Sequence, residues 1–200
     1  MVNLTDEAKK YVQKLNTTGQ IDDWGLSYSY VSWAADWQGD VGLPITTSVD
    51  KLECISEDTR GQKMDYKYRC TEDFMLHIDY GIYSPFNLVT PVQFPLMGKR
   101  QIDVKYPVDV DLNNMEKIYR KIPGYFSGYP DVKSCSFEVT ATFYGTFVYH
   151  RKGEQIEDGG YVSVSVGKLG NSSKNLTTVG ENLQYKLKGY YTQTVCLRNK

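Results

Sequence analysis

The sequence predicts a mainly β protein: an antiparallel β-sandwich or open barrel with long hairpins and two short helices. Three observations lead to this fold class. Side chains alternate between apolar and polar over long stretches, which is the period of a strand with one buried face. Clusters of Gly, Asp, Asn and Ser separate these stretches and mark turns. Only two segments repeat their apolar residues at helical spacing, so helices are a minor part of the fold.

A short amphipathic helix is predicted to open the chain. Thr5 is placed to cap its first turn, and Asn16 and Gly19 are good helix terminators. Its apolar residues recur at helical spacing: Ala8, Tyr11, Val12 and Leu15. A helix of this length is marginal alone and must dock on the rest of the protein. We therefore expect an N-terminal helix and linker over residues 1–20 and a single β domain over residues 21–200.

The stretch SYSYVSWAADWQGD, residues 27–40, is the candidate ligand or interface site. Alternation at Tyr28 and Tyr30 predicts a strand that ends in a turn after Val31, with one of two tryptophans buried and the other at a rim. The candidate residues combine aromatic rings with carboxylates: Tyr28, Tyr30, Trp33, Asp36, Trp37 and Asp40. Such a set suits a sugar-binding groove, but it is also typical of core or inter-subunit packing, which we favour.

The longest alternation runs from Met64 to Ile82, and Glu72 interrupts its apolar face, so a bend or bulge is expected there. The stretch from Ile45 to Cys54 precedes it, and the residues SEDTRGQK supply a turn. We therefore predict a hairpin over residues 45–82. Cys54 and Cys70 flank this turn at similar distances and are candidates for a cross-strand disulfide in an oxidising compartment.

Further strands are predicted at Cys135–Tyr149, at residues 161–166 and over the C-terminal stretch from residue 183. The proline-punctuated segment Ser84–Gly98 has the character of an edge strand. Apolar residues at helical spacing predict the second short helix near residues 112–122, ending before Pro123 and Gly124.

Composition narrows the classes of partner. Charged residues make up 24% of the 200 residues, with a formal net charge of −1, which argues against nucleic acid as the main partner. No apolar run approaches the 18 residues of a transmembrane helix, and the first ten residues do not resemble a signal peptide. We expect a soluble protein.

Sequence motifs for catalysis, metals and cofactors are missing. The chain has no G-x-S-x-G, and only His77 and His150 are available as imidazole bases. His77 and Asp79 share a strand face, which we interpret as a solvated face. The four cysteines contain no C-x-x-C pair, and the calcium-like residues 109–114 lack the required Gly. We expect no catalytic residues, no metal and no cofactor.

The sequence favours a non-enzymatic structural or interaction protein, a subunit of a larger assembly such as a virion or phage-tail-like particle. The alternative is a secreted glycan-binding or membrane-acting β-module. Four cysteines and four N-x-Ser/Thr sequons, at Asn3, Asn16, Asn171 and Asn175, point to this extracellular alternative. In either case we expect a homo- or hetero-oligomer. Its inter-subunit contacts are predicted in the 45–82 hairpin and in Ser84–Gly98.

Overall fold

A computed structural model describes residues 1–38, 42–52, 54–58, 68–94, 106–113, 117–121, 126–153 and 160–197. This part of the chain is mainly β with antiparallel sheets and two α-helices, which confirms the predicted fold class. It forms two compact units. Unit 1 comprises residues 1–49, 82–88 and 140–186, and unit 2 comprises residues 50–81, 89–139 and 187–200. The long strands β11, Phe126–Tyr144, and β15, Asn182–Leu197, contribute residues to both units. The domain boundary expected after residue 20 stays a prediction.

The predicted N-terminal helix is confirmed as α1, Leu4–Leu15, in unit 1. It follows β1, Val2–Asn3, which pairs in parallel with β7, Ile82–Tyr83. The cap is Asn3 and not Thr5, because Asn3 is the extended residue directly before the first turn. Its Oδ1 accepts a hydrogen bond from the backbone N–H of Asp6 at 3.2 Å.

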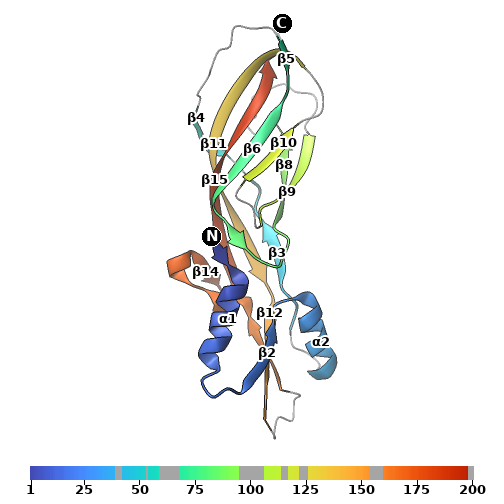
Figure 1. Cartoon of the computed structure of the whole chain (residues 1–200), viewed down its shortest axis with the longest axis vertical. Coiled ribbons are helices and arrows are strands. Elements are labelled where there is room, and N and C mark those ends of the chain that lie inside the picture. The colour runs from blue at the N-terminus through green and yellow to red at the C-terminus, as the bar shows by residue number, and fades with distance from the viewer. Residues whose placement is uncertain are drawn as a thin grey trace. The chain divides into compact units, whose positions relative to one another are not determined.

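The two helices of unit 1 lie on opposite faces of one small sheet (Figure 1). This sheet consists of β2 (Ile21–Gly25), β12 (Thr146–Arg151) and β13 (Tyr161–Ser165), with β12 in the centre. Phe147 of β12 meets Tyr11 of α1, with the ring centroids 5.7 Å apart. The next residue, Val148, packs against α2. Successive side chains of a strand point to opposite faces, so each face of β12 carries one helix.

The predicted strand at the start of residues 27–40 is wrong, because this segment forms helix α2, Tyr28–Gln38. Ser27 precedes the helix, and its Oγ accepts from the Tyr30 N–H at 3.3 Å. Val31 and Ala34 are fully buried and three residues apart, and both pack against Val148. Burial of these two small side chains against β12 therefore outweighs the local alternation of Tyr and Ser.

Gly145 divides the predicted strand Cys135–Tyr149 into β11, Phe126–Tyr144, and β12. Its φ of +102° is a conformation that favours glycine. A Cβ at this position would lie 2.6 Å from the carbonyl oxygens of Leu43 and Pro44. The backbone therefore turns out of β11 where only glycine fits.

The remaining elements of unit 1 follow β13. They are the 3₁₀ turns η1 (Val166–Leu169) and η2 (Ser172–Lys174) and the short strand β14 (Leu176–Val179). β14 forms a hairpin with the first residues of β15, Asn182–Leu197. β3, Thr46–Val49, pairs with the last residues of β11.

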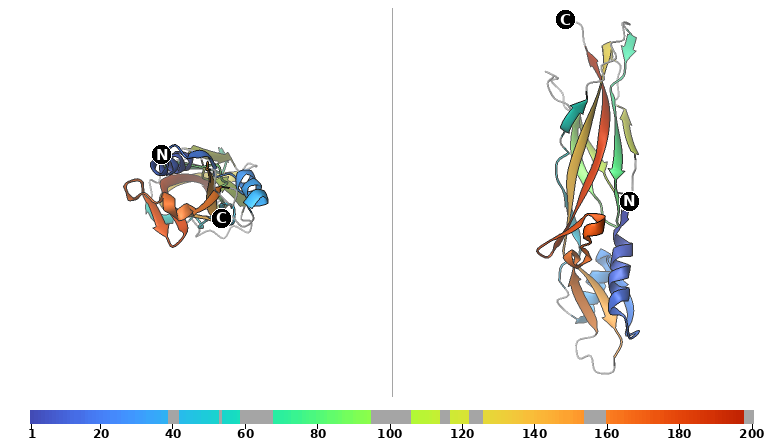
Figure 2. Two further views of the ribbon diagram at one scale, coloured as in Figure 1. Left: turned by 90° about the horizontal axis from the view of Figure 1, so that it is seen from below. Right: turned by 90° about the vertical axis from the view of Figure 1, so that its left-hand side faces the viewer.

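Unit 2 contains the order β10, β6, β15, β11 across one antiparallel sheet. The long strands β11 and β15, orange and red, lie side by side in Figure 2. β6 spans Asp73–Tyr80 and β10 spans Lys117–Lys121. β4 (Cys54–Asp58) and β5 (Tyr68–Cys70) pair with β11. A separate hairpin joins β8, Val89–Phe94, to β9, Tyr106–Asp111. The predicted alternation in β6 is confirmed, since its even-numbered apolar residues are buried: Phe74, Leu76 and Ile78.

Two sequence-based predictions about unit 2 are wrong. Among the described residues, the hairpin predicted over residues 45–82 is not formed, because β3 and β4 pair with β11 while β6 pairs with β15 and β10. The predicted turn at residues 59–63 lies outside the described residues. The second helix is not near residues 112–122, where Lys117–Lys121 forms strand β10. Ile118 and Arg120 suit a strand as well as a helix, and pairing with Leu76 and Phe74 of β6 decides for the strand. The predicted break at Glu72 is confirmed, because β5 ends at Cys70 and β6 begins at Asp73.

Candidate functional site

The predicted candidate residues are distributed over different surroundings on α2. Tyr28 is 70% exposed and Trp33 is 44% exposed, whereas Tyr30 is half-buried. Asp36 is exposed. The backbone of Trp37 is part of α2, and Asp40 lies outside the described residues.

The structure brings Tyr30 and Trp33 together. Their ring centroids are 5.9 Å apart, and Trp33 makes an edge contact with Tyr161 of β13 at 5.4 Å. Tyr30 also packs against Gly25, where a Cβ would lie 2.6 Å from the Tyr30 ring. Because Tyr28 and Tyr30 lie on a helix, their side chains do not share a face as the strand prediction required.

Sequence reasoning missed the polar side of this aromatic cluster. His150 of β12 has its Nδ1 2.6 Å from Oδ1 of Asp22 on β2, and its ring lies 4.8 Å from that of Tyr161. Lys152 is 4.0 Å from the same carboxylate. No sequence signal pairs residue 22 with residue 150, because their proximity comes from the antiparallel register of β2 on β12.

Electrostatics in the cluster oppose ionisation of its phenols. Burial, followed by the carboxylate of Asp23, raises the pKa of Tyr30. Burial and the charges of Asp23 and Asp22 also raise the pKa of Tyr161. The pKa of Asp22 is lowered, mainly by its hydrogen bond with His150. The cluster is thus an aromatic surface with an ionised carboxylate at one side, suited to packing and recognition.

A second group of exposed aromatic side chains lies on the sheet of unit 2. Tyr190 of β15 is opposite His77 of β6, and their ring centroids are 5.0 Å apart. His77 Nε2 is 3.4 Å from Oδ1 of Asp79, and both side chains are exposed to solvent, as interpreted from the sequence. On β10, the Tyr119 hydroxyl donates to Oδ2 of Asp73 at 3.0 Å, and this bond raises the pKa of Tyr119.

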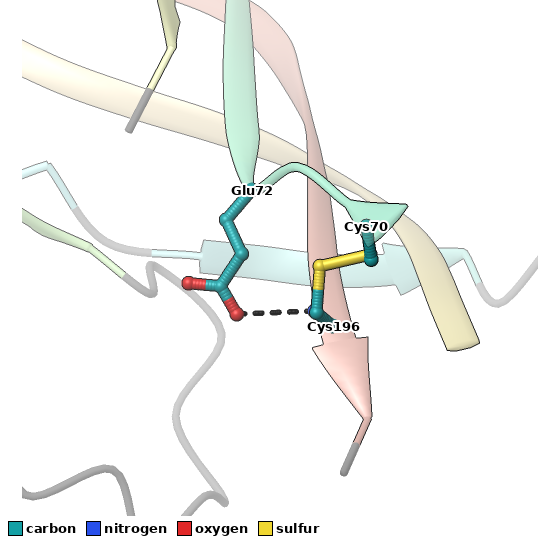
Figure 3. The surroundings of a disulfide bond; sticks show 3 residues. All are labelled: Cys70, Glu72 and Cys196. Carbon is teal, nitrogen blue, oxygen red and sulfur yellow. Dashed lines mark hydrogen bonds between the residues drawn. A yellow bond between two sulfur atoms is a disulfide. The ribbon is translucent and has the colours of Figure 1, made fainter. Parts of the chain in front are cut away.

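A disulfide joins Cys70 to Cys196, and the predicted Cys54–Cys70 bond is therefore wrong (Figure 3). The reason is topological: β5 and β4 lie along β11 and do not pair with each other, while the end of β15 reaches Cys70. Both bonded cysteines are buried. Next to the bond, Oε1 of the buried Glu72 accepts a hydrogen bond from the Cys196 N–H at 3.0 Å (Figure 3). Cys135 is disulfide-bonded as well.

Within the described residues, no three His, Cys, Asp or Glu side chains are grouped so that they would hold a metal ion. The helices in that part of the chain are too short or too polar to span a bilayer.

No family model matches this chain, and no curated protein matches it at a significant level. Among solved structures, a chain of the Cry23Aa1 and Cry37Aa1 binary protein complex is 16% identical with a TM-score of 0.49, covering 99% of this chain and 86% of that chain. A non-toxic crystal protein from Bacillus thuringiensis is 11% identical with a TM-score of 0.48, covering 99% and 94%. The Mpp75Aa1.1 β-pore-forming protein from Brevibacillus laterosporus is 9% identical with a TM-score of 0.28, covering 76% and 62%. The virion or phage-tail interpretation stays a prediction.

Proposed function

We propose that this protein is an extracellular β-module without enzymatic activity that acts at a membrane surface and associates with other chains. This is the second of the two interpretations drawn from the sequence, without its glycan ligand. The observation that carries it is the Cys70–Cys196 disulfide.

The disulfide supports an oxidising compartment. Cys70 and Cys196 lie 126 residues apart and are brought together only in the folded chain. The bond is buried, and it fastens the three-residue strand β5 to the end of β15. Cytosolic thiols are kept reduced, so a structural bond of this kind is typical of secreted and surface proteins.

The long strands support action at a membrane. Over residues 134–144 of β11, one face is apolar and buried, and it consists of Cys135, Phe137, Val139, Ala141 and Phe143. The opposite face carries mostly Ser and Thr, with Glu138 as its one charge. A membrane-spanning β-strand needs about 9–11 residues with this two-residue alternation. The same segment therefore suits a folded sheet in water and a sheet in contact with lipid.

The exposed tyrosines of unit 2 support association with other chains. Tyr80, Tyr119 and Tyr190 are between 41% and 58% exposed, and they come from the adjacent strands β6, β10 and β15. Tyr is enriched at protein interfaces because it combines a large apolar ring with a polar tip.

Vesicle binding tests the proposed function. Oxidised protein is mixed with dye-loaded vesicles of neutral lipid and, separately, of neutral lipid with anionic lipid. Co-sedimentation and dye release are measured at several protein concentrations. We expect co-sedimentation with at least one vesicle type and release that rises steeply with protein concentration. Protein that keeps its near-ultraviolet circular dichroism but neither sediments with nor permeabilises either vesicle type would contradict membrane action.

A further inference from the structure

We infer that Asn175 is the sequon asparagine at which the folded chain accepts an N-linked oligosaccharide. The chain has four N-x-Ser/Thr sequons, at Asn3, Asn16, Asn171 and Asn175. All four lie in unit 1, and the structure separates them by what each side-chain amide does. This inference rests on the proposed extracellular location.

The amide of Asn16 is fully engaged in holding the turn after α1. Its Nδ2 donates to the carbonyl oxygen of Ile21 at 2.9 Å, and its Oδ1 accepts from the N–H of the same residue at 2.8 Å. A sugar on Nδ2 would have to replace or displace this donation. The two bonds join the end of α1 to the first residue of β2, so their loss would loosen both elements.

Asn171 is engaged on both sides of its amide. Its Nδ2 donates to Oε2 of the buried Glu7 at 3.1 Å, and its Oδ1 accepts from the Ser173 hydroxyl at 2.7 Å. Ser173 is also the third residue of this sequon, so the hydroxyl of the sequon is engaged by Asn171. An oligosaccharide at Asn171 would be directed toward α1.

Asn3 is half-buried between β1 and α1, and its Oδ1 caps the helix. Leu4 beside it is fully buried. The amide plane of Asn3 is therefore fixed by the cap.

Asn175 is different in each of these respects. It is exposed and follows η2 with a φ of +58°, at the turn between η2 and β14. Among the described residues, its side chain makes no hydrogen bond, and only its backbone N–H is engaged, by the Ser172 carbonyl. The third residue of its sequon, Thr177, is exposed on β14. The side chains of Asn175 and Thr177, which the enzyme that transfers the oligosaccharide must recognise, are thus both exposed to solvent.

The transfer is a substitution at the anomeric carbon of a lipid-pyrophosphate-linked oligosaccharide. Nδ2 of Asn175 forms a bond to C1 of the first sugar while the bond from C1 to the pyrophosphate oxygen breaks. The lipid pyrophosphate leaves, and Nδ2 loses one proton. No oxidant or reductant is needed, and the product amide keeps one N–H and its carbonyl.

Glycopeptide mapping of protein secreted from yeast or insect cells tests this inference. The protein is digested after removal of glycans by an amidase in ¹⁸O-water, and mass spectrometry locates the labelled Asp. We expect the label at Asn175. Thr177→Ala should abolish it, Thr177→Ser should retain it, and Thr18→Ala should leave it unchanged, because Thr18 belongs to the Asn16 sequon. Secreted, folded protein that is unlabelled at Asn175, or labelled at Asn3, Asn16 or Asn171, would overturn the inference.

Failure of this experiment is distinguishable from failure of the proposed function. The vesicle measurements use protein refolded under oxidising conditions from bacteria, which carries no such glycan. A negative vesicle result with a labelled Asn175 would overturn membrane action alone. A positive vesicle result with an unlabelled Asn175 would overturn only the glycosylation site.

Discussion

The carboxylate of Glu7, on α1, accepts a hydrogen bond from the ammonium group of Lys174, which lies 167 residues later in the sequence at the end of η2. Lys10 and Asn171 donate to the same carboxylate at 3.0 and 3.1 Å. The Glu7 side chain is only 6% exposed. The ion pair joins the N-terminal helix to the segment before β14, and a buried carboxylate with three donors is strongly held.

The Glu7 pair should make stability depend on pH. Burial alone would raise the pKa of Glu7, but the hydrogen bonds from Lys174, Asn171 and Lys10 outweigh it and lower the pKa to about 2. The folded pKa is below that of the unfolded chain. The contribution is therefore complete above about pH 5 and is lost as the pH falls toward 2, amounting to on the order of 3 kcal/mol.

Urea unfolding of wild type and Glu7→Gln from pH 7 to pH 2 measures this contribution. We expect Glu7→Gln to lower the free energy of unfolding at pH 7 by about 2–3 kcal/mol and to flatten its decline below pH 5. Glu181→Gln is the matched control, since Glu181 is exposed on a turn. Parallel pH curves for wild type and Glu7→Gln would exclude the ion pair as the cause.

Removal of the Cys70–Cys196 disulfide should destabilise the protein substantially. The bond closes a long loop, and in the chain-entropy view such a loop restricts the unfolded state, so its loss costs about 2–5 kcal/mol. The double variant Cys70→Ala/Cys196→Ala is compared with wild type by guanidinium unfolding. An unchanged midpoint in the double variant would show that the bond does not stabilise the folded chain.

Gly145 and Gly180 should respond differently to alanine. Both have positive φ, but a Cβ at Gly145 would strike two carbonyl oxygens, whereas a Cβ at Gly180 would meet nothing within 4 Å. We expect Gly145→Ala to lower the free energy of unfolding by about 3 kcal/mol or more, and Gly180→Ala by about 1 kcal/mol. Thermal unfolding of both variants provides the comparison. Equal losses would mean that backbone strain alone matters at Gly145.

Trp33→Ala should cost about 1–2 kcal/mol, less than the 3–5 kcal/mol of a core aromatic, because Trp33 is half-exposed. Its edge contact with Tyr161 should also contribute to the near-ultraviolet circular dichroism, which the variant would lose in part. Tyr28→Ala serves as control, since its exposed ring should change stability by less than about 0.5 kcal/mol. A loss at Trp33 no larger than at Tyr28 would show that the aromatic cluster is not stabilising.

Self-association should depend on the exposed tyrosines of unit 2. We expect the double variant Tyr119→Ser/Tyr190→Ser to weaken association in sedimentation velocity by at least tenfold, because both rings are exposed on adjacent parts of one sheet. Tyr28→Ser, in unit 1, should leave association unchanged. Wild-type protein that stays monomeric at every concentration would contradict association of this chain with itself.

The local pattern of the sequence was sufficient for the elements with a clear periodicity of apolar residues. Alternation in β6 and β15 predicted which side chains are buried, and helical spacing predicted α1. The break at Glu72 was also visible, because a charged residue interrupts an apolar face. These features depend on which face of an element packs against the core, and the apolar side chains along the sequence indicate that face.

The tertiary structure decided the pairing of strands and the nature of short ambiguous segments. Tyr28 and Tyr30 alternate with Ser27 and Ser29 as in a strand, but Tyr28–Gln38 forms α2, because Val31 and Ala34 are buried against Val148, more than a hundred residues away. β10 became a strand through its hydrogen bonds with β6. The same applies to Cys70, whose partner is Cys196 and not the sequence neighbour Cys54.

The sequence by itself thus determined the fold class, the N-terminal helix and the buried faces of the long strands. Only the tertiary structure decided which strands are neighbours, which cysteines bond, and which of four sequons is open to solvent. The physical reason is that the buried face of a segment appears in the sequence as a periodic pattern of apolar residues. The register and the neighbours of a strand are set by backbone hydrogen bonds between distant segments, and the backbone groups are the same whichever side chains are present.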